Sequence, residues 1–130
     1  METIKKRLGI LMGLLTTEFV LGMVINLFKS ESPQNNPLLV KFSFLAHGVV
    51  GLLLLVGGIW LVTVAVKSKN STHKQTAFLA ALGILVAFAA GIATVRVDVA
   101  FKAYASFAMA MGFVLAISSC GRLLSSLNKK

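Results

Sequence analysis

The chain has 130 residues and a net charge of +9, yet only 13% of its residues are charged and 57% are hydrophobic. Its mean hydropathy of +0.88 lies far above that of soluble domains. This composition excludes an ordinary water-soluble globular protein, and the length allows one domain over residues 1–130.

Four apolar segments are each long enough to cross a bilayer. A hydrocarbon core about 30 Å thick requires about 20 residues of helix. In lipid every backbone amide must find its partner within the segment, which favours helices over open strands. The sequence therefore predicts an all-α integral membrane bundle of four transmembrane helices, at about 8–28, 42–66, 76–95 and 99–121.

The first segment follows three cations, Lys5, Lys6 and Arg7, as the apolar part of a secretory signal would. It is longer than such a part, however, and the residues 26–29 that end it offer no small-x-small cleavage site. We expect a retained first span.

Glu18 lies near the middle of this span, about 15 Å from either end at 1.5 Å per residue. An acidic side chain at that depth costs about 3 kcal/mol on insertion scales. Gly22 and Asn26 follow at four-residue intervals, and they make a polar, roomy stripe with Glu18. Two interpretations stay open: a hydrogen bond to a neighbouring helix, or the binding of a proton or cation.

His47 lies near the outer end of the second span, at about the depth of Asn26, and Gly51 and Gly58 share its helical face. An imidazole can ligate haem, carry a proton or make a simple hydrogen bond. The sequence predicts a proton or ligand site formed by Glu18, Asn26 and His47.

Small residues recur every four positions in the last two spans, which lets helix backbones approach closely. The connection between these spans, residues 96–98, is very short, so the spans should form a tight antiparallel hairpin. A homodimer face is the alternative use of the stripes. Their members are Gly83, Ala87 and Gly91 in the third span and Ala108, Gly112 and Ala116 in the fourth.

The positive charges gather on one side of a chain that crosses four times. By the positive-inside rule both termini are expected in the cytoplasm, with the protein in the plasma (inner) membrane. No aromatic residues interleave with the basic clusters, so the expected partner is the lipid bilayer and its anionic headgroups, not nucleic acid. The nine cations are Lys5, Lys6, Arg7, Lys67, Lys69, Lys74, Arg122, Lys129 and Lys130.

The stretch 46–55, AHGVVGLLLL, resembles the second helix of one half of the haem A synthase family, and 82–86 with 90–95 is similar to that family's third helix. The family is built from two four-helix halves, and this chain has the length of one. The resemblance implies a bound haem with His47 as its ligand.

The family pairs that histidine with another on helix four, where this chain has none. A five-coordinate haem, a quinol-type ligand and a non-catalytic relative therefore stay open. The polar and sulfur-bearing residues at the corresponding place are Tyr104, Ser106, Met109 and Met111.

The size of the chain and a glutamate in the middle of the first span are also similar to small multidrug exporters, in which that glutamate exchanges protons for cationic drugs.

The favoured expectation is a haem-linked or redox accessory protein with an outer-side site at His47 and an intramembrane Glu18. One alternative is a proton-coupled transporter of small molecules or cations that uses Glu18. The other is a non-catalytic structural subunit of a larger membrane complex, or a homo-oligomer.

Overall fold

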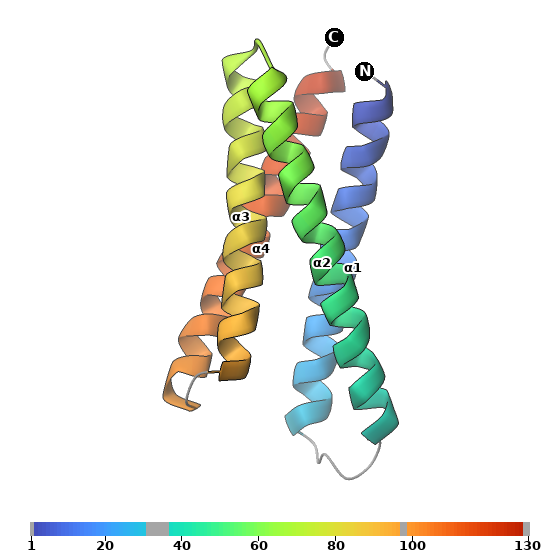
Figure 1. Ribbon diagram of the computed structural model, residues 1–130, viewed down its shortest axis with the longest axis vertical. Helices are drawn as coiled ribbons and strands as arrows, with labels where there is room; N and C mark the ends of the chain where they lie inside the picture. Colours follow the sequence, from blue (N-terminus) through green and yellow to red (C-terminus); the bar gives the residue numbers. More distant parts are fainter. Residues whose placement is uncertain (1, 31–36, 97–98, 129–130) are drawn as a thin grey trace.

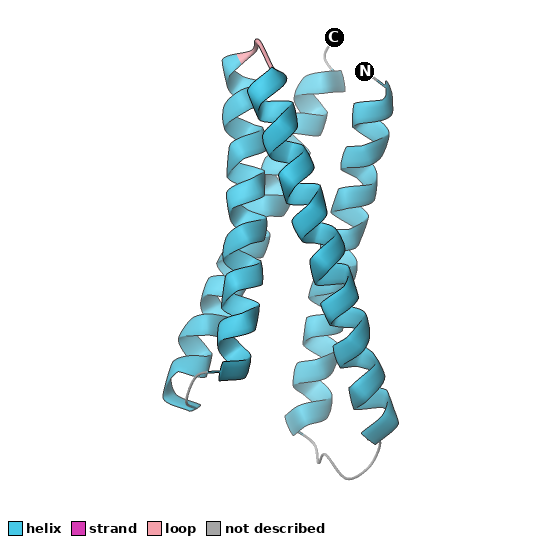
Figure 2. Ribbon diagram, in the orientation of Figure 1, coloured by secondary structure: helices cyan, strands magenta, loops and turns pink. Residues whose placement is uncertain are grey.

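Four long helices make up the part of the chain that the computed structural model describes, residues 2–30, 37–96 and 99–128 (Figure 1). Figure 2 shows no strand among them. All four helices are long and apolar enough to cross a membrane, which confirms the all-α prediction at this level. They are α1 (Glu2–Ser30), α2 (Pro37–Lys67), α3 (Ser71–Arg96) and α4 (Val99–Asn128).

Local sequence explains where α2 and α3 begin. Pro37 is the first residue of α2, where its fixed φ suits the helix and its missing N–H is not needed. The side-chain oxygen of Asn70 accepts hydrogen bonds from the backbone N–H groups of Thr72 at 2.9 Å and His73 at 3.3 Å. Asn70 thus caps α3. Only residues 68–70 separate α2 from α3, so these helices are antiparallel neighbours.

The helices contact one another as a ring. The most extensive interface joins α3 to α4, followed by α2 with α3 and α1 with α2, and the smallest joins α1 to α4. Both ends of the chain and the α2–α3 connection lie at one end of the bundle, which we call the termini end (Figure 1). Toward the opposite end, the α1–α2 pair and the α3–α4 pair diverge.

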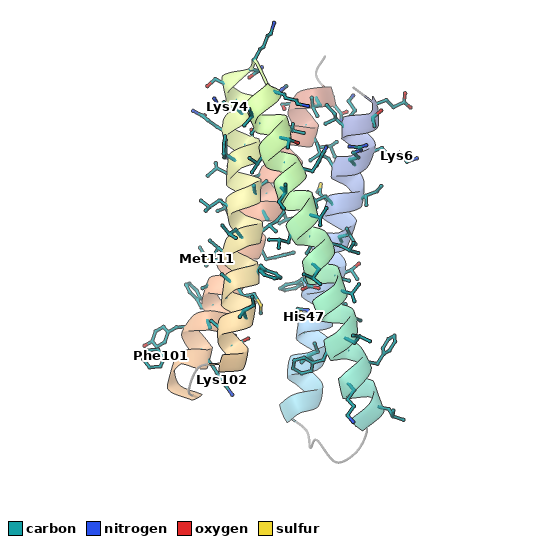
Figure 3. The ribbon with its side chains drawn as sticks, viewed as in Figure 1. Lys6, His47, Lys74, Phe101, Lys102 and Met111 are labelled. Carbon is teal, nitrogen blue, oxygen red and sulfur yellow. The ribbon has the colours of Figure 1, made fainter. Side chains whose placement is uncertain are left out.

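Charge is distributed unequally between these two ends. Lys6 and Lys74 lie at the termini end, and Lys102 lies at the opposite end (Figure 3). The Arg7 guanidinium lies 5.9 Å from the centre of the Trp60 ring, a cation–π contact that joins α1 to α2 near the termini end.

The core occupies the half of the bundle nearest the termini end. In the opposite half, Ser43 and Ala90 are buried, and large apolar side chains lie on the outside of every helix, as is usual for helices in lipid. The core comprises Leu8, Leu11, Leu15, Leu54, Leu61, Ala65, Ala77, Ala80, Ile84, Ala116, Cys120, Leu123 and Leu127.

The backbones of α3 and α4 are in direct contact at two glycines. A Cβ atom at Gly83 would lie 2.6 Å from the backbone nitrogen of Ala116 and 2.6 Å from the carbonyl oxygen of Gly112. A Cβ atom at Gly112 would lie 2.6 Å from the nitrogen of Ala87. Neither site has room for a side chain, so each requires glycine for reasons of space.

The remaining members of the two stripes lie nearer the opposite end and pack less tightly. A Cβ atom at Gly91 would meet the sulfur of Met109 on α4 at 3.8 Å, an ordinary contact. Ala108 lines a shallow apolar groove between the two helices, together with Ala90 and Tyr104. The stripes therefore face each other within one chain.

We predict that Gly83→Ala or Gly112→Ala destabilises the protein by about 1–3 kcal/mol, because each methyl group would force two helix backbones apart. Thermal unfolding in detergent, followed by circular dichroism, measures the effect. The matched control is Gly13→Ala on α1, where a Cβ atom would meet nothing within 4 Å. An unchanged midpoint for both α3 and α4 variants would contradict the proposed backbone contact.

Candidate intramembrane site

The antiparallel register of α1 and α2 brings their polar residues together. A Cβ atom at Gly57 of α2 would meet the side chain of Leu11 of α1, and one at Gly22 of α1 would lie 3.6 Å from Cε1 of His47. One turn from His47 toward the termini end, a Cβ atom at Gly51 would lie 3.2 Å from Oε1 of Glu18. Glu18 is thus level with Gly51, and its side chain extends toward His47.

Glu18 and His47 form a direct contact between α1 and α2. Oε1 of Glu18 lies 3.1 Å from Nδ1 of His47, within ion-pair distance. The side chains are 20% and 24% exposed, respectively. Figure 3 shows His47 below the middle of the bundle, nearer the opposite end, on the side of α2 that faces α1. The sequence places these residues at different depths, and the length of the glutamate side chain closes that distance.

The pair stands apart from the other polar side chains of the helices. Hydroxyl groups such as those of Thr16, Thr17 and Thr94 donate to a carbonyl oxygen of their own helix. In contrast, Oε2 of Glu18 and Nδ1 of His47 are buried and make no hydrogen bond among the described residues, since the 3.1 Å approach of Nδ1 to Oε1 is a charge contact without hydrogen-bond geometry. The carboxyl group therefore has an acceptor that the described helices do not satisfy, which is costly in a low-dielectric interior.

Two glycines and an aromatic ring shape the space around the pair. The missing side chains of Gly22 and Gly51 leave room for the imidazole and the carboxylate. Phe88 of α3 closes the site on one side, since its ring atoms would lie 3.9 Å from a Cβ atom at Gly51. Phe19, next to Glu18, stacks on Phe113 of α4 with centroids 4.7 Å apart and planes at 17°. All four helices contribute to this level of the bundle.

Ser43 is a further polar residue of the site that the sequence analysis missed. It lies one turn from His47 on the same face of α2, on the side nearer the opposite end, and it is only 6% exposed. Four-residue spacing to His47 was a usable signal. Serine is so common in membrane helices, however, that only its burial distinguishes it.

The other predicted site residues do not join the pair. The side chain of Asn26 lies outside the described residues. His73 is in the first turn of α3, at the termini end. Tyr104 lies on the exposed surface of α4.

Comparisons with protein-family models, curated proteins and solved structures found no match to this chain. The resemblances to haem A synthases and to small multidrug exporters therefore stay predictions.

We predict that Gly51→Ala separates Glu18 from His47, because its methyl group would lie 3.2 Å from Oε1 and the carboxylate must move. In isotope-labelled protein, the ring nitrogen chemical shifts of His47 should change in the same direction as in Glu18→Gln. The matched control is Gly48→Ala, where a Cβ atom would meet nothing within 4 Å. Identical His47 shifts in Gly51→Ala and the parent protein would contradict the contact.

Proposed function

We propose that the protein is a proton-coupled transporter of small-molecule organic cations, with the Glu18 carboxylate shared between a proton, His47 and the transported cation. The observation that supports this function best is the Glu18–His47 contact of 3.1 Å, in which the second carboxylate oxygen is buried without a hydrogen-bond partner among the described residues. Intramembrane acids of this kind are typical of proton and ion pathways.

The chemistry of the pair suits exchange. A carboxylate facing an imidazolium is a favourable charge pair, and its strength grows as water is excluded. Protonating the carboxylate removes that attraction. An incoming cation can instead replace the imidazolium beside Glu18 while His47 loses its proton. Binding of a cation and release of a proton are thus linked through one carboxylate.

The distribution of described cations supports an orientation for this transporter. Among the residues whose side chains are described, seven cations lie at or near the termini end, against Lys41 and Lys102 toward the opposite end. By the positive-inside rule we propose that the termini end faces the cytoplasm and that the protein resides in the plasma (inner) membrane. The seven are Lys5, Lys6, Arg7, Lys67, Lys69, Lys74 and Arg122.

We predict that adding tetraphenylphosphonium to the protein in weakly buffered detergent solution releases protons, and that Glu18→Gln lowers this release at least tenfold. His47→Gln should lower it as well, because it removes the competing base. Glu2→Gln serves as the control, since Glu2 is an acidic residue in the first turn of α1 and far from the pair.

An infrared difference spectrum between acid and neutral buffer gives a second readout, in which Glu18→Gln should remove one carboxyl band. The chain has only four acidic residues, which makes the assignment practicable. A spectrum and a proton release that are both unchanged in Glu18→Gln would contradict the proposal.

A haem-linked function is the second candidate, and the same contact favours it. Histidines that ligate a metal commonly donate their other ring N–H to a carboxylate, and Nδ1 of His47 lies 3.1 Å from Oε1 of Glu18. If haem binds, Nε2 of His47 would hold its iron, and the haem would supply redox chemistry. Within residues 2–30, 37–96 and 99–128, no three His, Cys, Asp or Glu side chains gather to hold a bare metal ion.

If haem binds, the purified protein supplied with haem should show a Soret band that His47→Ala removes. Glu18→Gln should weaken haem affinity about 10–100-fold, as expected for loss of a carboxylate that orients a ligand. His73→Ala is the matched control, because His73 lies at the termini end. A colourless preparation in the presence of excess haem would exclude this candidate.

A further inference from the structure

The layer of the bundle between the pair and the termini end is apolar on every helix. One turn from Glu18 on α1 lies Leu15, and close to one turn from Gly51 on α2 lies Leu54. Ile84 of α3 and Ala116 of α4 occupy the equivalent positions, one turn from Phe88 and Gly112. All four side chains are 5% exposed or less. This layer offers a proton or cation no polar group.

The side toward the opposite end differs in both chemistry and packing. Ser43 is a buried polar residue one turn from His47, and Lys41 begins the membrane-crossing part of α2. From Lys41 to His47 the helix rises about 9 Å. The two helix pairs also diverge toward this end (Figure 1). A buried hydroxyl group, that of Ser43, therefore lies between the pair and this end of the bundle.

We infer that the Glu18–His47 pair exchanges its ligand with the opposite end of the bundle, along the face of α2 that carries Ser43, and is closed to the termini end by the apolar layer. The inference rests on the pair being the functional site, as proposed above. It concerns access alone, and therefore holds for a proton, a cation or another small polar ligand.

Thiol labelling separates access from function. In a Cys120→Ala background, Gly22→Cys places a thiol beside His47, because a Cβ atom there makes only an ordinary contact of 3.6 Å. A small, permanently charged methanethiosulfonate reagent should modify this thiol at least tenfold faster when applied at the opposite end than at the termini end. Protease cleavage of a C-terminal tag establishes which end is exposed in each vesicle preparation.

Two matched controls on α1 make the result specific. Val20→Cys lies at a similar depth but is 51% exposed on the surface that faces lipid, and Leu15→Cys lies in the apolar layer. Neither should react appreciably from either end, because the charged reagent enters neither lipid nor the core. Reaction of Val20→Cys at the rate of Gly22→Cys would overturn the inference.

Filling the proposed path tests the role of Ser43. Adding Ser43→Leu should slow the labelling of Gly22→Cys from the opposite end at least fivefold, whereas Phe42→Leu, on the exposed surface one residue away, should leave it unchanged. Equal labelling from both ends, faster labelling from the termini end, or no labelling from either would overturn the inference. None of these labelling rates depends on proton release. The labelling can therefore contradict the access route while proton release supports the proposed function, and proton release can contradict the function while the labelling supports the route.

Discussion

The backbone contact of α3 with α4 at Gly83 and Gly112 is the constraint around which the bundle is arranged. Lipid is as apolar as leucine, so burying apolar surface does not drive helices together in a membrane as it does in water. Close packing of small residues provides the attraction instead. These two helices consequently share the largest interface. The α2 helix packs against α3 at positions that include a glycine, such as Gly58 beside Ile84. The α1 helix is held mainly by α2.

The Glu18–His47 pair lies at the border between the two halves of this arrangement. On one side is the leucine- and alanine-rich core, and on the other the helix pairs diverge. A charged or strongly polar contact placed inside the core would have lost all solvent, and one placed at the helix ends would have been screened by water. At the border it remains about one-fifth exposed. In that intermediate environment solvent screens the interaction only in part.

Sequence patterns predicted the four helices well because the thickness of a bilayer and the need to satisfy every backbone amide leave little choice. The small-residue spacing also indicated which glycines can bring backbones together, although it could not separate Gly83, which has no room for a methyl group, from Gly91, which has. The contact of Glu18 with His47 was harder to predict from the sequence, because it depends on the register of α1 against α2 and on the length of a flexible side chain. Burial of Ser43 and the position of Phe88 depend on packing between helices, which no single-helix pattern encodes.

The small size of the α1–α4 interface bears on how the molecule assembles. Every other interface joins helices that follow one another in the chain. Each helix can therefore pack against the helix before it as the chain is added to the bilayer. The interface between α1 and α4, which includes the stacked rings of Phe19 and Phe113, can form only after α4 has been synthesised.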